Sequence, residues 1–198
     1  MARMLNPVHL VLGEDDFLAE RATKAVIAAA GEGVEVTTLR AGDVSEGEIA
    51  MATSPSLFAE DRVVVVKHAE LAGKEPTAIL LKACVDPAPG ITLVIEHTGG
   101  GRQKAMVSKF AKAAEVHTAD PLKDNERRTW LMEEFRRHGV RPTPDVAAAV
   151  LESVGSDLRE LASAVSQLVS DTEGELTVEA VRAYYVGVAE VAGFDIAD

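Results

Sequence analysis

The sequence predicts an α/β domain with a parallel five-stranded sheet over residues 1–120, followed by a small all-helical domain over residues 121–198. Short apolar segments alternate with amphipathic segments up to about residue 120, which is typical of β-α-β units covered by helices on both faces. Beyond that point the strand signals stop and helical segments follow one another. With 198 residues, 47% of them hydrophobic, the chain is long enough to form a hydrophobic core in each of the two domains.

The predicted strands are short apolar runs, at 8–12, 34–39, 63–66, 91–95 and 116–118. The run Val63–Val66 predicts a strand buried on both faces, whereas the alternation of apolar and polar residues over 34–39 predicts an outer strand. Helices are expected at 17–30, 43–53, 77–85 and 103–114, and the first should be capped by Asp15 or Asp16. The second domain is expected to hold helices at 122–138, 144–154, 156–170 and 177–185.

The composition excludes several classes of protein. The net charge of −12 argues against a chain that binds nucleic acid along its whole surface. Residues 102–141 are nevertheless basic, with ten Lys and Arg against six Asp and Glu. No apolar stretch approaches the roughly 20 residues of a membrane span. The single cysteine, Cys84, excludes an internal disulfide, suits a cytoplasmic protein and lies in an apolar segment that predicts burial.

The patterns that carry catalysis are missing from the sequence. The five histidines, at 9, 68, 97, 117 and 138, are scattered and include no pair at helical spacing that would clamp a metal ion. No Gly-x-Ser-x-Gly elbow is present. We therefore expect no catalytic residues, no metal site and no intrinsic enzyme activity.

The turn after the first strand is where such a domain would bind the phosphates of a nucleotide. A phosphate-binding loop needs glycines, a lysine and a Ser or Thr. The segment Gly13–Arg21 instead begins with three consecutive acidic residues after its glycine, and no Gly-Lys-Ser/Thr occurs in the chain. The sequence therefore predicts that ATP is not a cofactor.

Two basic segments are candidates for contact with DNA or another phosphate. Arg102 and Lys104 follow three glycines at the start of a predicted helix, and Arg127 and Arg128 lie on the first helix of the second domain. For Arg102 and Lys104 the alternative is a flexible connection between a strand and a helix, and for Arg127 and Arg128 it is a solvated basic face. In both cases the alternative is the more frequent role of such residues.

The segment Ser54-Pro55-Ser56-Leu57-Phe58 lies between a predicted helix and the valine-rich strand. Its Pro and Ser residues break the chain, so Leu57 and Phe58 are placed on a loop. They either fold back into the core or remain exposed as apolar contacts for a partner. The residue pattern alone favours core filling.

Several stretches resemble the delta subunit of bacterial DNA polymerase III, a subunit of the loader that places the sliding clamp on DNA. They occur in the family's order along essentially the whole chain, and the most specific is the Ser-Leu-Phe stretch before a valine-rich strand. These stretches are Leu10–Leu18, Ser56–Val65, Ser156–Leu161 and Phe194–Asp198.

The resemblance implies an AAA+-like (RecA-type) module that has lost its ATP site, followed by a helical lid domain. It implies that Leu57 and Phe58, on a loop shaped by Ser54, Pro55 and Ser56, bind the sliding clamp (the beta subunit) and help to open its ring. Primed DNA in the assembled loader and the other loader subunits are the further implied partners. Family members continue into a third, helical collar domain that joins the subunits, so a chain ending at Asp198 is expected to be a truncated form.

Without the family resemblance, the residue pattern leaves two other functions open. The alternating architecture suits a nucleotide-dependent enzyme of the P-loop type, against which the acidic turn argues. The basic segment 102–141 suits a general DNA-binding module, which would bind tightly and with strong salt dependence.

Overall fold

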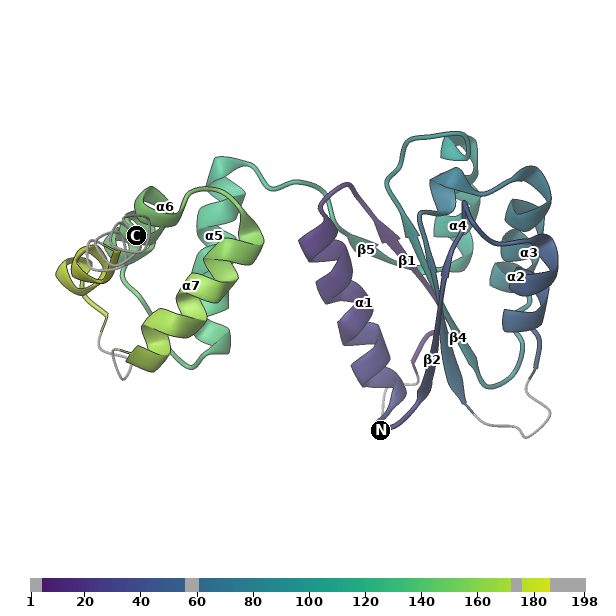
Figure 1. Ribbon diagram of the computed structural model, residues 1–198, viewed down its shortest axis with the longest axis horizontal. Coiled ribbons are helices and arrows are strands. Elements are labelled where there is room, and N and C mark those ends of the chain that lie inside the picture. The colour runs from purple at the N-terminus through teal and green to yellow at the C-terminus, as the bar shows by residue number, and fades with distance from the viewer. Residues whose placement is uncertain (1–4, 56–60, 172–175, 186–198) are drawn as a thin grey trace, which may run out of the picture. The chain divides into compact units, whose positions relative to one another are not determined.

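The computed structural model describes residues 5–55, 61–171 and 176–185, and the chain divides into two compact units, Met1–Pro121 and Leu122–Asp198 (Figure 1). The first unit contains the strands β1 (Val8–Leu12), β2 (Glu35–Arg40), β3 (Arg62–Lys67), β4 (Ile91–His97) and β5 (Glu115–Thr118). Its helices are α1 (Asp16–Ala30), α2 (Glu46–Ala52), α3 (Lys74–Val85) and α4 (Val107–Ala113), with short 3-10 turns η1 (Ala69–Leu71) and η2 (Lys104–Met106).

The five strands form one parallel sheet in the order β2-β3-β4-β1-β5. This confirms the predicted α/β class and the parallel five-stranded sheet. The alternating strand β2 is an edge strand, as its pattern predicted, and the short β5 is the other edge. The valine run forms β3, which pairs with β2 on one side and β4 on the other.

Strand β3 shows why its sequence is apolar at every position. Successive side chains of a strand point to opposite faces. Val63 and Val65 pack in the cluster that contains Val26 of α1, whereas Val64 and Val66 pack in the cluster formed with α2, α3 and α4. All four valines are at most 1% exposed. Helices therefore cover both faces of the sheet, and α1 lies on the face opposite to α2, α3 and α4 (Figure 1).

The helix starts follow local capping chemistry. Asp15 is the N-cap of α1, and its carboxylate accepts a hydrogen bond from the Leu18 amide at 2.9 Å. Ser45 begins α2 with a capping box, in which Ser45 and Glu48 bond each other's backbone amides. Because of this cap, α2 begins at Glu46 rather than at the predicted residue 43.

Among the residues that the structure describes, the second unit contains helices and the loops that join them, and no strand. It contains α5 (Asp124–Arg137), α6 (Pro144–Val154) and α7 (Leu158–Asp171), and residues 178–185 are also helical. The three named helices pack on one another around buried apolar side chains. These buried residues are Leu131, Phe135, Val146, Val150, Leu161, Val165 and Leu168.

Cys84 lies on the inner face of α3 and is 3% exposed. Burial raises the pKa of its thiol to about 12, so the thiolate that a nucleophile needs is not formed near neutral pH. Cys84 is thus a small core residue, as its apolar neighbours predicted.

Within the described part of the chain, no helix combines the length and apolarity needed to cross a bilayer.

Two buried histidines link the stability of the first unit to pH. His9 is 1% exposed and His97 is 2% exposed. Burial lowers the pKa of both below 6.5, and His117, whose Nε2 is 2.9 Å from His9 Nδ1, lowers that of His9 further. The unfolded chain therefore binds more protons than the folded chain just below pH 6.5.

We expect the free energy of unfolding to include the full contribution of the two neutral histidines above pH 6.5. It should fall as the solution is acidified below pH 6.5. Urea denaturation followed by circular dichroism between pH 5 and pH 8 measures this slope. Replacing both His9 and His97 by glutamine should flatten the slope, whereas His138→Gln, at an exposed histidine, should leave it unchanged. A slope that persists in the double variant would contradict the assignment.

Candidate functional site

The carboxyl ends of β1 and β4 are the position at which a nucleotide-binding α/β domain holds phosphates. Here β1 is joined to α1 by only three residues, Gly13, Glu14 and Asp15. The Gly13 amide donates to the His97 carbonyl at 3.1 Å, and the Asp15 amide donates to the Ala119 carbonyl at 2.9 Å. These two amides are therefore used within the protein, whereas a phosphate-binding loop turns its amides toward the ligand.

Gly13 also brings this turn into contact with the chain that follows β5. A Cβ atom on Gly13 would lie 2.0 Å from the carbonyl carbon of Ala119, and the φ of Gly13 is +149°. Only glycine fits such an approach. The turn is consequently closed against residues 119 and 120 rather than arched over an open site.

The remaining space at this edge is small and acidic. A cavity of about 20 Å³, room for about one water molecule, is lined in part by Asp16, Glu70 and Glu96. Glu70 is 6% exposed, lies 3.2 Å from His68 Nδ1 and accepts a hydrogen bond from the Thr98 amide at 3.2 Å. Glu96 accepts a hydrogen bond from the Thr23 hydroxyl at 2.7 Å. These carboxylates are held by internal partners and present negative charge where a polyphosphate would bind.

The described residues that flank the predicted partner segment lie at the opposite edge of the sheet. All strands are parallel, so the connection from α2 into β3 reaches the sheet at its amino-terminal edge, whereas the nucleotide position is at the carboxyl edge. Ser56, Leu57 and Phe58 lie outside the residues that the structure describes, so the exposure of Leu57 and Phe58 stays a prediction. Ser54 is exposed, as is Pro55.

The end of α2 is held by several hydrogen bonds just before this segment. The Thr53 hydroxyl donates to the Ile49 carbonyl at 2.8 Å, and the Ser54 hydroxyl donates to the Ala50 carbonyl at 2.6 Å. Ser54 and Pro55 also line a hollow of about 350 Å³, whose other wall is formed by Ile79, Lys82, Ala83 and Asp86 of the α3 region. Ser54 and Pro55, the last residues that the structure describes before Ser56, therefore lie beside α3.

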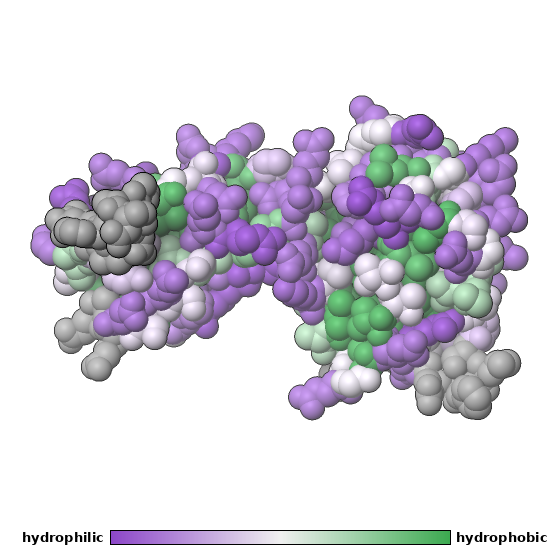
Figure 2. All heavy atoms as spheres, in the orientation of Figure 1, coloured by the Kyte–Doolittle hydropathy of each residue, from purple (hydrophilic) through white to green (hydrophobic). Residues whose placement is uncertain are grey.

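Apolar side chains are exposed around this edge. Met51 near the end of α2 is 72% exposed and Val85 at the end of α3 is 78% exposed, the two largest values among the exposed large hydrophobic residues of the described chain. Figure 2 also shows hydrophobic atoms gathered near the lower end of α1. A hollow of about 460 Å³ in this region is lined by apolar residues such as Leu5 and Val34 together with polar residues such as Asp61 and Thr92. Exposed apolar surface of this kind is typical of protein-binding regions.

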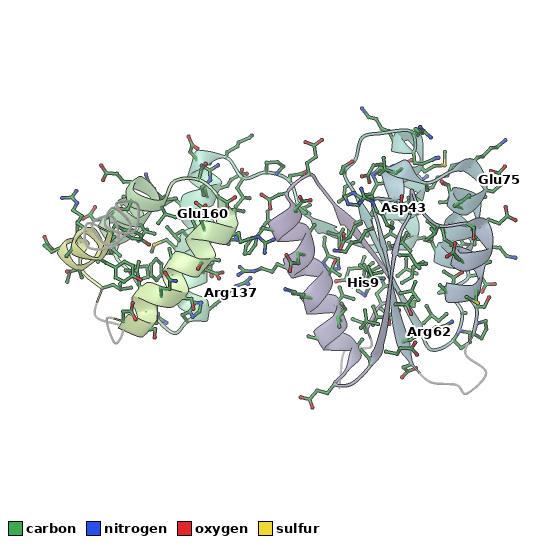
Figure 3. The ribbon with its side chains drawn as sticks, viewed as in Figure 1. His9, Asp43, Arg62, Glu75, Arg137 and Glu160 are labelled. Atoms are coloured by element: carbon green, nitrogen blue, oxygen red, sulfur yellow. The ribbon has the colours of Figure 1, made fainter. Side chains whose placement is uncertain are left out.

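Arg62, the first residue of β3, is a residue at this edge that the sequence did not single out. Its Nη2 donates to the carbonyl oxygen of Ser54 and lies 3.5 Å from that of Met51. Figure 3 shows Arg62 at the lower end of the sheet. A cation directly after a loop is a weak sequence signal, since most such residues are solvated.

The four basic candidates for phosphate contact differ in their surroundings. Arg102 and Lys104 are exposed and lie in the first unit. In the second unit, Arg127 donates to Asp124 Oδ1 at 2.7 Å and to the Leu122 carbonyl at 2.9 Å, and its side chain is 19% exposed. Arg127 thus supports the start of α5, while Arg128 beside it is exposed. Contact of Arg102, Lys104, Arg127 or Arg128 with a phosphate therefore stays a prediction.

The described residues contain no group of three or more His, Cys, Asp or Glu side chains placed to hold a metal ion. His9 of β1 lies in register with Glu115 of β5, and its Nδ1 is 2.9 Å from Nε2 of His117 on the same strand β5. This pair is accounted for by its internal hydrogen bond.

Comparison with known proteins identifies the fold. No protein-family model and no curated protein matches the sequence. The structure is similar to that of the DNA clamp loader delta protein of Bacillus subtilis, with a TM-score of 0.72 and 15% identity over 90% of this chain and 58% of that one. It is also similar to the RuvB Holliday junction branch migration motor of Thermotoga maritima, with a TM-score of 0.54 and 17% identity over 91% of this chain and 61% of that one. The chain thus spans about three fifths of each of these proteins, and it has the AAA+-like fold that they share.

Proposed function

We propose that this chain is a non-catalytic clamp-loader subunit that binds a bacterial sliding clamp through Leu57 and Phe58. The observation that carries the proposal is the likeness of 90% of the chain to a clamp loader delta protein, combined with a Ser-Leu-Phe segment that enters β3 from the end of α2. The proposed setting is cytoplasmic, within a DNA polymerase III assembly. Other loader subunits and primed DNA are the further proposed partners there.

The proposed mechanism converts binding energy into opening of the clamp ring. A ligand shifts an equilibrium only toward the state that it binds more tightly. Burying a leucine and a phenylalanine in an apolar pocket contributes roughly 2–3 kcal/mol each. If both contacts are made fully only with the open ring, their sum of about 5 kcal/mol is enough to move a two-state equilibrium by several thousandfold.

Binding of the chain to a purified bacterial sliding clamp tests this proposal. Biolayer interferometry with the immobilised clamp should show saturable binding by the wild-type chain. The extent of binding should change little between low and physiological salt, because the contact is apolar rather than ionic. Absence of binding at tens of micromolar chain would overturn the proposed function.

We further propose that the chain works without ATP. The amides of Gly13 and Asp15 are bonded internally, and Glu70 and Glu96 line the small space that remains beside them. Isothermal titration with ATP and Mg²⁺ should therefore detect no binding in the micromolar range. Micromolar binding would instead favour the alternative of a P-loop-like enzyme and would require the turn after β1 to open.

A further inference from the structure

Arg62 has a backbone that both neighbouring strands hold in place. It is the first residue of β3, and it lies in register with Glu35 of β2 and Ile91 of β4. Its amide donates to the Gly90 carbonyl at 2.9 Å. The side chain therefore extends from a fixed point at the amino-terminal edge of the sheet (Figure 3).

The guanidinium group reaches back along the sequence to the end of α2. Nη2 donates to the carbonyl oxygen of Ser54 and is 3.5 Å from the carbonyl oxygen of Met51. The Ser54 amide donates to the same Met51 carbonyl at 3.3 Å. A cation at the carboxyl end of a helix is stabilised by the carbonyl dipoles there. This contact joins the residue at which the chain leaves α2 to the residue at which it enters β3.

Capping of α2 alone does not account for this contact. The hydroxyls of Thr53 and Ser54 already bond the carbonyls of Ile49 and Ala50, so these helix-end acceptors are satisfied without Arg62. The Ser54 carbonyl that Arg62 binds lies beyond the helix, whose last residue is Ala52. In addition, Arg62 Nε is buried without a hydrogen-bond partner, a cost that a freely solvated side chain would avoid. The contact thus holds the chain after the helix rather than the helix itself.

We propose that Arg62 is a positioning residue for the clamp contact, an inference that rests on the proposed function. Its guanidinium fixes the carbonyl of Ser54 and thereby the direction in which Pro55 continues from α2. A contact segment that is already oriented loses less conformational entropy when it binds, so its affinity is higher. Lysine would keep the charge but not the planar group that spans two carbonyls.

The test combines a partner-free measurement with a binding measurement. In Arg62→Gln, hydrogen exchange of the Ser54 amide should be faster, and the affinity for the sliding clamp should fall by about tenfold, the effect of having to order about one more residue on binding. Arg62→Lys should give an intermediate loss, and it keeps the test valid if the glutamine variant folds poorly. Exchange of the amides in the β3–β4 ladder should stay at the wild-type rate, because the loss is confined to the end of α2, whereas a purely structural role of Arg62 would loosen the sheet as well.

Arg40→Gln is the matched control, since Arg40 is the last residue of β2 and its 3.6 Å ion pair with Asp43 is exposed. This variant should leave both exchange and affinity unchanged. Unchanged Ser54 exchange or wild-type affinity in both Arg62 variants would overturn the positioning role while leaving the proposed function standing. Failure of the wild-type chain to bind the clamp would overturn both the positioning role and the proposed function.

Discussion

The double substitution Leu57→Ala and Phe58→Ala is expected to abolish measurable binding to the sliding clamp. Removing the two apolar side chains forfeits roughly 2–3 kcal/mol each, which together correspond to an affinity loss of about a thousandfold or more. Titration of the variant against the immobilised clamp, beside the wild-type chain, measures the loss. If both side chains are exposed, as the proposal requires, the circular dichroism spectrum should be unchanged, because exposed side chains contribute little to the free energy of unfolding.

A control that shortens two other exposed apolar side chains of the same unit makes this result specific. Met51 and Val85 are exposed apolar residues of the same unit, and replacing both by alanine should reduce affinity far less than the loss of Leu57 and Phe58. Equal losses in the two double variants would show that general hydrophobicity of this edge governs binding. Wild-type affinity of the Leu57 and Phe58 variant would show that the segment was wrongly assigned.

Replacing Gly13 by alanine is expected to have the largest effect on the stability of the first unit. The added Cβ atom would lie 2.0 Å from the Ala119 carbonyl carbon and 2.4 Å from the Asp120 nitrogen. Both are backbone atoms, so neither can rotate away, and the turn must separate from the chain after β5. We expect a loss of about 4 kcal/mol or more in the free energy of unfolding, or failure to fold.

Gly31 provides the matched control for the backbone strain alone. Its φ is +127°, and a Cβ atom there would meet nothing within 4 Å. Gly31→Ala should therefore cost only about 1–3 kcal/mol, the range for a strained backbone without a clash. Urea denaturation of both variants compares them directly. If the two lose equal stability, the contact of Gly13 with Ala119 does not hold the closed turn.

The fold could be predicted from sequence because its signals are local and repeated. The valine run of β3 and the alternation of β2 indicate which faces each strand buries, and α6 begins at Pro144, as predicted. The predicted helix 103–114 is less regular, and forms the 3-10 turn η2 followed by α4. Its sequence carries no N-cap signal, and the residues before α4 make no side-chain cap.

The geometry of the site depends on contacts between residues distant in the sequence, which local patterns do not encode. The acidic residues after Gly13 indicated a poor phosphate site, but not that the turn is closed by Ala119. Arg62 is an ordinary surface cation in the sequence, and only the return of the chain to the sheet brings it to Ser54. The strand order, likewise, follows from packing across the whole unit.

The central claim, that position 58 contacts the clamp, is tested most directly by photocrosslinking. A photoreactive p-benzoylphenylalanine placed at Phe58 should form a covalent product with the sliding clamp, and mass spectrometry should map it to an apolar pocket on the clamp surface. The same group placed at Val116, an exposed residue of β5, should give no such product. Crosslinking from position 116 but not from position 58 would contradict the claim.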